Sequence, residues 1–300
     1  MLYNNLSTYF RDRYGKRIKK ICIDGGFSCP NRDGKCGTGG CIFCGERGSG
    51  EHIDAMVSIR EQVLRGLAGA ADDDVFVAYF QNFSNTYADV SVLRARYDEA
   101  LCDERIRALA IGTRADCIDE EKARLIAEYA TRVEVWVELG LQSSSDKTAK
   151  VINRGYERCA FDEAVRILKS YGIPVVAHMI IGLPGEGGDE CVATAKYISS
   201  LGIWGVKIHS LYVMEGTELA EIYKKGLYTP PTLPEYASIA AECIGHIDAN
   251  MIIHRITGDC PRDMLIAPEW NRDKNKIILE IVENMSERGI TQGSLKGDSL

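Results

Sequence analysis

The sequence contains no long hydrophobic run. Apolar stretches such as "VVAHMIIGL" are far shorter than the ~20 residues that a membrane-spanning helix needs, so we expect no membrane association. The N-terminal stretch "MLYNNLSTYFRDRYGKRIKK" is polar and aromatic, and it lacks the apolar segment of a secretory signal. From these two absences we expect a cytoplasmic protein.

Positive charge is scarcer than negative charge. The chain has 36 Lys and Arg residues against 43 Asp and Glu residues, a formal net charge of −7. This balance argues against a protein that coats nucleic acid by bulk electrostatic attraction. One local exception is "RDRYGKRIKK" at residues 11–20, with six basic residues and one acidic residue beside Tyr9, Phe10 and Tyr14. This segment either contacts phosphates and stacks on a base, or forms a solvated N-terminal face.

The sequence lacks both usual marks of a disulfide framework, which are an even number of cysteines and an export signal. The chain has 11 cysteines, an odd number. In a reducing compartment, clustered cysteines are more often metal ligands or catalytic thiols. Five dispersed cysteines lie in helix-like or strand-like segments, and we expect them to be small buried hydrophobic residues. They are Cys102, Cys117, Cys159, Cys191 and Cys243.

Strand-like and helix-like segments alternate from residue 20 to about residue 226. The six strand candidates are short and apolar: "KKICIDGG", "DVFVAYFQ", "IRALAIGTR", "RVEVWVELGLQS", "PVVAHMIIGLP" and "GVKIHSLYV". Single amphipathic helix patterns separate them, which favours a parallel sheet with right-handed crossovers. Six such units fit either a doubly wound sheet or a (β/α) barrel, and periodicity does not distinguish the two.

The pattern changes after the prolines at positions 230 and 231. A predicted helix at about 234–249, the apolar segment "MIIHRIT", a loop and a last helix at about 271–287 follow. We therefore divide the chain into a basic N-terminal arm (1–20), an α/β core (21–226) and a C-terminal helical or mixed appendage (227–300) that closes the core.

Five cysteines lie close together within and after the first predicted strand. Cys22 is inside the strand and is expected to belong to the core. The other four follow the carboxyl end of that strand, where parallel α/β folds bind ligands. They are Cys29, Cys36, Cys41 and Cys44. The glycines between them permit positive φ angles and a close approach of the backbone to a cofactor.

Three kinds of site fit this cluster. A structural zinc site usually uses two ligand pairs, but only Cys41 and Cys44 form a C-x2-C pair, and His52 is the only imidazole nearby in sequence. A redox C-x-x-C motif would need no further thiol such as Cys29. An iron–sulfur cluster held by three thiolates, with one iron left open, fits one pair and a more distant cysteine. The spacing favours the iron–sulfur site and leaves the other two open.

The same segment resembles the N-terminal signature of radical S-adenosylmethionine (SAM) enzymes. It is similar to the YhcC/YtqA-type bacterial family, which is related to the radical domain of the Elongator catalytic subunit. The resemblance rests on "ICIDGGFSCPNRDG" and "GTGGCIFCGERG", and continues in "AYFQNFSNTYADVSVLRARYDEAL", "VWVELGLQS", "INRGY", "HMIIGLPGE", "HRITGDCP" and "LIAPEWNRDK". It implies a partial (β/α)6 TIM-like barrel with a 4Fe–4S cluster and SAM as cofactors. The implied activity is reductive cleavage of SAM to a 5′-deoxyadenosyl radical.

The resemblance implies that Cys29, Cys41 and Cys44 bind the cluster. Cys36 departs from the family pattern and creates a rival trio, Cys36–Cys41–Cys44, whose spacing is nearer to the common arrangement of the superfamily. The stretch "CPNRDG" around Cys29 matches the family, so we favour Cys29 and expect Cys36 to be dispensable.

The resemblance also assigns cofactor-binding residues to the SAM pocket, most of them at strand ends. Phe43 directly precedes the last cysteine, and Gly182 lies beside the adenine. Polar candidates for the methionine end, the ribose hydroxyls and the SAM carboxylate are Gln81, Asn85, Thr86, Glu138, Gln142 and Arg154. The polar residues have structural alternatives, since Glu138 would also suit a surface ion pair and Gln142 a helix cap.

The substrate side is expected in the barrel interior. Lys207 and His209 are two residues apart on one strand and therefore face the same side, which makes them the catalytic candidates. His178 is more simply a core histidine. Kinship with the Elongator radical domain and the basic arm favour tRNA, with modification of the wobble uridine. Small molecules or proteins are the other possible substrates.

Two further expectations concern partners and the competing class of protein. A radical SAM enzyme needs an electron donor such as flavodoxin or ferredoxin. The alternative to an enzyme is a non-catalytic module that uses zinc to organise a nucleic-acid-binding surface. Metal content and SAM cleavage distinguish the two.

Overall fold

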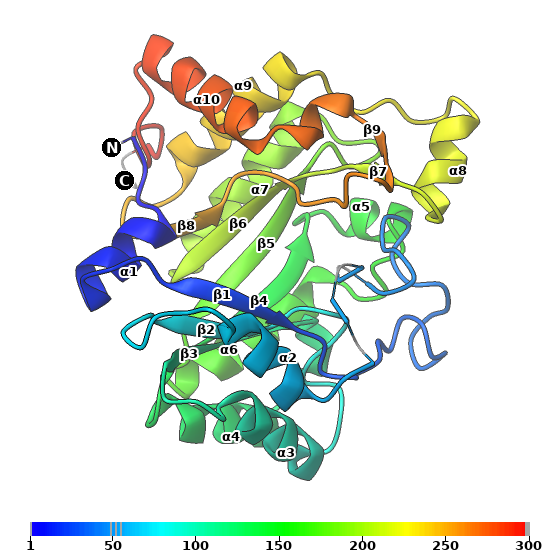
Figure 1. Cartoon of the computed structure of the whole chain (residues 1–300). Helices are drawn as coiled ribbons and strands as arrows, with labels where there is room; N and C mark the ends of the chain where they lie inside the picture. The colour runs from blue at the N-terminus through cyan, green and yellow to red at the C-terminus, as the bar shows by residue number, and fades with distance from the viewer. Residues whose placement is uncertain (1, 49, 52, 55, 298–300) are drawn as a thin grey trace.

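A single parallel sheet forms the centre of the computed structural model, which describes residues 2–48, 50–51, 53–54 and 56–297. The sheet has seven strands in the order β1-β2-β3-β4-β5-β6-β8, curled into a half-barrel (Figure 1). The strands are β1 (Lys19–Ile23), β2 (Phe76–Phe80), β3 (Ile106–Thr113), β4 (Glu134–Gln142), β5 (Val175–Ile181), β6 (Gly205–Ser210) and β8 (Ile252–Arg255). Every neighbouring pair is parallel.

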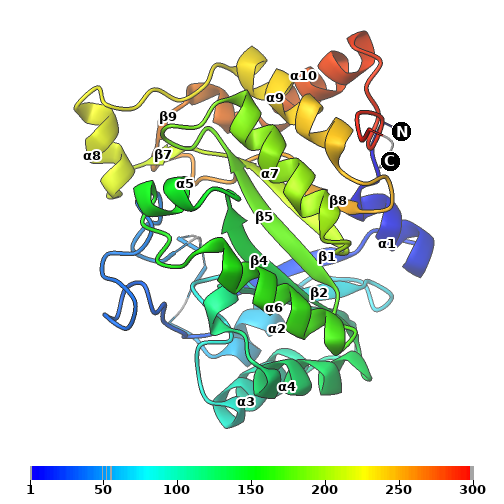
Figure 2. The ribbon, with the colours of Figure 1, turned by 180° about the vertical axis from the view of Figure 1, so that it is seen from behind.

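Helices cover the outer face of the sheet, as the view from behind shows (Figure 2). They are α2 (Ile59–Leu67), α3 (Val90–Ala100), α4 (Glu120–Ala130), α6 (Arg158–Ser170), α7 (Gly188–Ser200), α9 (Leu233–His246) and α10 (Lys274–Glu287), with α10 packed on α9. The main hydrophobic core lies between these helices and outward side chains of the strands, such as Ile23, Phe80 and Leu109.

Short elements complete the loops at the carboxyl ends of the strands. They are α5 (Asp146–Val151), α8 (Glu218–Lys224), the antiparallel pair β7 (Val213–Met214) and β9 (Leu265–Ala267), and two 3₁₀ turns, Ala115–Cys117 and Glu269–Arg272. Ile42, Leu183, Leu211 and Leu219 form a second apolar cluster among them. This cluster gives the cysteine loop a fixed support.

The six predicted strands are all present, and the partial-barrel class implied by the resemblance is confirmed. The seventh strand, β8, comes from the segment "MIIHRIT", which we had placed in the C-terminal appendage. It pairs with β6 in parallel and thus extends the half-barrel. Residues after 226 therefore supply an edge of the sheet as well as covering helices. A strand of only four residues is too short to show the alternating pattern that would distinguish it from a loop.

Local signals explain where the helices begin and end. The side chain of Ser58 caps α2, that of Asp119 caps α4, and Thr232 with Glu235 forms a capping box at α9. Gly172 and Gly202, just past the ends of α6 and α7, have φ angles of 68° and 56°. Such positive φ angles favour glycine over residues with a Cβ atom.

The N-terminal segment is not a free arm. It forms α1 (Leu6–Tyr14), which closes the half-barrel at the amino ends of the strands (Figure 1). Phe10 is only 1% exposed and packs on Trp136, and the hydroxyl groups of Tyr9 and Tyr14 donate to Glu134 at the start of β4. The aromatic side chains that we considered for base stacking are thus committed to internal contacts.

Neighbouring carboxylates neutralise several basic residues of this segment. Lys16 pairs with Asp73 and Lys19 pairs with Asp74, both at 2.5 Å. Arg13 lies 3.5 Å from Glu134. The solvated-face alternative therefore describes this segment better than a nucleic-acid contact. No helix in the described part of the chain has the length and apolar content needed to cross a membrane.

The dispersed cysteines differ in burial. Cys117, Cys191 and Cys243 are buried, as expected, and Cys102 is half-buried. The expectation is wrong for Cys159, which is exposed on α6. It occupies the solvent side of an amphipathic helix whose apolar face is formed by Phe161, Val165 and Leu168.

Candidate active site

The cysteine loop follows β1 and is fastened to the segment after α5. Asn31 is buried and donates from Nδ2 to the carbonyl of Asn153 at 2.6 Å, while Asn153 donates to the carbonyl of Gly40 at 2.7 Å. The backbone of Ile42 accepts from Leu219 and donates to Ile152. Two separate parts of the chain, residues 152–153 and Leu219, thus fix the loop around the C-x2-C pair.

Three of the four loop cysteines line one large cavity. They are Cys29, Cys41 and Cys44. Cys36 is exposed and does not line the cavity. Its sulfur instead lies 3.8 Å from Asp116 and 3.7 Å from the guanidinium of Arg114.

Burial and nearby guanidinium groups act in opposite directions on the pKa values of the thiols. Burial raises the pKa of the thiols of Cys41 and Cys44, while Arg114 acts in the opposite direction on Cys41 and Arg32 on Cys44. Arg32 also donates to the carbonyls of Cys44 and Gly45, at 3.2 and 2.6 Å. These arginines would offset the negative charge of thiolates bound to a metal.

The donor set fits an iron–sulfur cluster. Three thiols share one cavity, and thiolates are the usual ligands of such clusters. In the described part of the chain, no three Cys, His, Asp or Glu side chains converge as ligands of a single ion would. A tetrahedral zinc site needs that convergence, whereas a cluster distributes its thiolates over separate irons. His52 lies outside the described residues.

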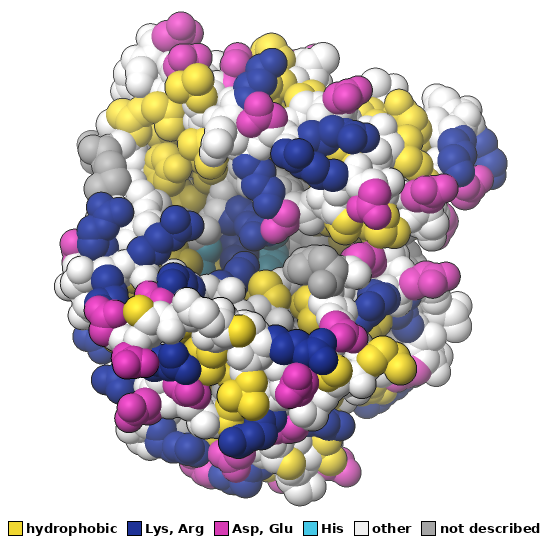
Figure 3. All heavy atoms as spheres, viewed as in Figure 1, with side chains coloured by type: hydrophobic (Ala, Val, Ile, Leu, Met, Phe, Trp, Pro, Cys, Tyr) yellow, Lys and Arg dark blue, Asp and Glu magenta, His cyan; other side chains and the backbone are white. Residues whose placement is uncertain are grey.

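Below the cysteine loop, the cavity continues into the half-barrel, where its wall becomes polar. Gly112 on β3 and Gly140 on β4 line this part together with longer side chains from β2, β4, β5 and β6. Tyr79, Glu138, His178 and Lys207 lie in this layer. Figure 3 shows the hollow in the face of the molecule, with Lys, Arg and His side chains in its depth.

Glu138 is the centre of this polar layer and is 2% exposed. One carboxylate oxygen accepts from the indole of Trp136 at 2.9 Å. The other accepts from Lys207 and lies 2.9 Å from Nε2 of His178. The Lys207 ammonium also donates to the hydroxyl of Tyr79 at 3.3 Å. The alternative of a surface ion pair for Glu138 is therefore wrong, because its partners are inside the half-barrel.

Burial and mutual charge set the protonation states in this layer. Burial alone would raise the pKa of Glu138, but Lys207 and His178 outweigh it and hold that pKa well below its usual value. Burial lowers the pKa of Lys207 to about 8. Burial also lowers the pKa of His178 and, more strongly, that of His209. At neutral pH the layer therefore holds a carboxylate, an ammonium group and uncharged imidazoles.

Both catalytic candidates line the cavity. The ring of His209 lies 5.1 Å from that of His178, and its Nε2 is buried with no hydrogen-bond partner among the described residues. His178, which we expected to be a core histidine, also borders the cavity and keeps its bond to Glu138. Lys207 and His209 thus face the interior of this cavity.

The candidates for SAM binding fall into two groups. The first group lines the same cavity as the thiols and comprises Phe43, Gln81, Glu138, Gln142 and Arg154. Gln142 has a φ of 61° at the end of β4, a left-handed conformation that is uncommon outside glycine. The second group does not line this cavity and comprises Asn85, Thr86 and Gly182.

The second group makes internal contacts. Asn85 donates to the carbonyl of Gly112 at 2.7 Å, and Thr86 donates to the carbonyl of Cys117 at 2.9 Å, with both side chains fully buried. Gly182 lines a separate surface pocket, where its carbonyl accepts from Tyr228. These contacts tie Asn85 to the carboxyl end of β3 and Thr86 to the 3₁₀ turn that follows it.

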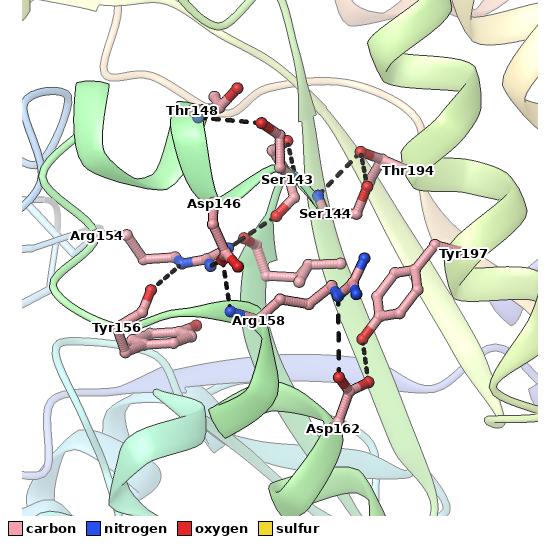
Figure 4. A network of polar contacts seen from close by, with 12 residues as sticks. Ser143, Ser144, Asp146, Thr148, Arg154, Tyr156, Arg158, Asp162, Thr194 and Tyr197 are labelled. Carbon is pink, nitrogen blue, oxygen red and sulfur yellow. Dashed lines mark hydrogen bonds and ion pairs between the residues drawn. The ribbon is translucent and has the colours of Figure 1, made fainter.

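Arg154 is a buried brace, as Figure 4 shows. It is 1% exposed and donates to the carbonyls of Leu141 and Ser143, at 2.5 and 2.8 Å, and of Tyr156 at 3.0 Å. Its Nη2 lies 3.3 Å from Asp146. A guanidinium has five N–H donors, and these contacts use most of them. Little hydrogen-bonding capacity remains for the SAM carboxylate.

Sequence reasoning missed several residues that line the cavity. They are Lys20, Arg32, Tyr79, Arg114, Tyr156, Tyr212, Arg255 and Asp259. Lys20 and Tyr79 had a usable signal, because strand alternation places them on the interior side. Arg255 had none, since its strand was not predicted.

Comparisons with known proteins identify the family of this chain. Residues 34–198 match the model of the Radical SAM superfamily, and residues 203–287 match that of the Radical_SAM C-terminal domain. The Bacillus subtilis protein YtqA is 36% identical over 97% of this chain and 92% of its own length. The chain therefore belongs to the radical SAM superfamily, is a radical SAM enzyme, and the resemblance to the YhcC/YtqA type is confirmed.

Two further comparisons are with a tRNA uridine(34) acetyltransferase and with a solved Elp3 structure. The tRNA uridine(34) acetyltransferase of Dehalococcoides mccartyi is 30% identical over 63% of this chain and 42% of its own length. The structure of Methanocaldococcus infernus Elp3 superposes with a TM-score of 0.65 at 20% identity, and covers 78% of this chain and 59% of the other. The structural likeness shows the shared fold.

Proposed function

We propose that this radical SAM enzyme holds a 4Fe–4S cluster through Cys29, Cys41 and Cys44 and acts on a uridine of tRNA. The observation that carries the first part is that these three thiols line one cavity, while Cys36 lies outside it. When bound and reduced, the cluster supplies the electron that splits SAM and so yields the 5′-deoxyadenosyl radical of this family.

The residues of the chain have supporting roles in this proposal. Arg32 steadies the backbone of Cys44 and Gly45 through its two hydrogen bonds. Phe43, Gln81 and Gln142 border the space between the thiols and the polar layer, where SAM would lie. At the amino ends of the strands, the packed rings of Phe10 and Trp136 keep water from entering the half-barrel.

Glu138 and its partners would meet the substrate. The buried carboxylate holds the Nε2 proton of neutral His178, which orients the imidazole toward the cavity. Lys207 is held by the same carboxylate. This arrangement fixes the positions of two proton-bearing groups beside the reacting atoms.

The cofactor proposal is tested by anaerobic reconstitution. We expect about four irons per chain and release of 5′-deoxyadenosine when dithionite and SAM are added. Cys29→Ala should lose the cluster, and Cys36→Ala serves as the matched control that keeps it. The reverse result would show that Cys36 is the third ligand. One tightly bound zinc without SAM cleavage would instead favour the zinc-binding module.

Relatives support the tRNA substrate, since the name of the Dehalococcoides mccartyi protein specifies tRNA uridine. The N-terminal basic segment adds little to this support, because Lys16 and Lys19 are paired with carboxylates and its aromatic residues pack against the core. Comparing the modified nucleosides of tRNA from cells with and without the protein tests the substrate directly. Cells that carry only the Cys29→Ala variant should match those without the protein. An unchanged nucleoside profile would favour a small-molecule or protein substrate, and flavodoxin or ferredoxin should serve as the electron donor in either case.

A further inference from the structure

The half-barrel is open on one side, because its edge strands β1 and β8 do not pair with each other. Each edge carries a cation that lines the cavity, Lys20 on β1 and Arg255 on β8. Lys207, on the strand beside β8, is the cross-strand partner of Arg255. Figure 3 shows Lys and Arg side chains around the hollow on this side of the molecule.

Lys20 and Lys207 both lie over the ring of Tyr79. The ammonium group of Lys20 lies 4.9 Å from the centre of the Tyr79 ring, and that of Lys207 lies 4.5 Å from the same centre. Lys20 and Arg255 both repel the charge on Lys207 and reinforce the effect of burial on it. Three like charges thus share one space.

The carboxylates do not balance this charge. Among the described residues, Glu138 and Asp259 are the only carboxylates that line the cavity. Glu138 is already bonded by Trp136, His178 and Lys207. Asp259 is shared between Arg255, at 3.2 Å, and Lys274. Lys20 has no carboxylate within ion-pair distance in the described chain. In the part of the chain that the structure describes, Nε2 of His209 is also buried in this interior without a partner.

We propose that the open side of the half-barrel binds an oxyanion of the substrate, a phosphate or a carboxylate, between Lys20 and Arg255 with Lys207 behind them. An anion there relieves the repulsion among the three cations, and the guanidinium offers it a paired donor geometry. The substrate then enters from the side, with its anionic group at the edges and its reacting carbon toward the thiols. The direction of entry rests on the proposed function, whereas the anion site itself does not.

The experiment is calorimetric titration of the reconstituted, SAM-saturated protein with inorganic phosphate and, separately, with succinate at low ionic strength. We expect saturable binding of at least one probe. Lys20→Met and Arg255→Met should each weaken it about tenfold, and the double variant should abolish it. Lys20→Arg, which keeps the charge, should retain it. Arg17→Met is the matched control, because Arg17 is exposed and does not line the cavity.

Two results would overturn the inference. One is the absence of saturable binding of both probes to the native protein, and the other is equal binding to the native protein and the double variant. Release of 5′-deoxyadenosine is measured on the same native sample. If SAM is cleaved but neither probe binds, the anion site alone fails. If a probe binds through Lys20 and Arg255 but SAM is not cleaved, the proposed function fails and the anion site stands.

Discussion

Glu138 and Lys207 form an ion pair inside the half-barrel, where their side chains are 2% and 7% exposed. They come from β4 and β6, strands separated by β5, and His178 on β5 joins the same carboxylate. A pair this deep is costly to desolvate, so its partners depend on each other.

Breaking this pair should destabilise the protein strongly. We expect Glu138→Gln to lower the free energy of unfolding by about 3–5 kcal/mol, because Lys207 is then left buried without its counter-charge. The double variant Glu138→Gln/Lys207→Met should lose less than the sum of the single variants. Urea denaturation of the four proteins measures this coupling. Strictly additive losses would contradict the pairing.

The buried histidines should make stability depend on pH. Burial lowers the pKa of His254 from 6.5 to about 3, and the pKa values of His178 and His209 are also lowered. Between the folded and unfolded pKa values the unfolded chain binds more protons, so stability is fully present above pH ~6.5 and falls as the pH drops toward 3.

His254→Phe should therefore reduce the acid sensitivity of stability between pH 6.5 and 4 relative to the native protein. Its ring packs edge-on against the rings of both Trp136 and Trp204, where a phenyl ring is a suitable replacement. Thermal unfolding at several pH values provides the measurement. His246→Phe, a substitution in α9 outside the half-barrel interior, is the control. Identical pH slopes for the native protein and His254→Phe would count against the prediction.

Arg154 should affect stability more than SAM binding. We expect Arg154→Met to lower the free energy of unfolding by roughly 3 kcal/mol or more, since three carbonyls lose their buried donor. Arg158→Met should cost less than ~1 kcal/mol, because its ion pair with Asp162 is half exposed and 3.9 Å long. If Arg154→Met kept native stability but bound SAM much more weakly, the result would support the carboxylate-binding role that the resemblance implied.

The N-terminal helix should be essential for the folded core. Phe10→Ala removes a ring that is 1% exposed against Trp136, and we expect a loss of about 3–5 kcal/mol. Arg11→Ala, at the exposed neighbouring position, should change stability by less than ~0.5 kcal/mol. Chemical denaturation compares the two. Equal, small effects would show that the segment is a dispensable arm.

Much of the site could be read from the sequence because its parts are local. The C-x2-C pair, the glycines around it and the ends of apolar strands lie within short segments, and Cys29, Cys41, Cys44, Lys207 and His209 do line the cavity. Asn85 and Thr86 show where the prediction of site residues from local sequence stops working. They follow β2 as expected, but the turn directs their side chains back to the ends of neighbouring strands.

The sequence by itself determined the alternation of six strands with helices, the helix caps and the spacing of the thiols, since each depends on short local segments of the chain. Tertiary structure decided what depends on distant segments meeting. It excluded Cys36 from the cavity, committed the aromatic residues of the basic segment to the core and added β8 to the sheet. It also brought Lys20 and Arg255 to opposite edges of one opening, because only closure of the sheet into a half-barrel places residues 20 and 255 on the same cavity.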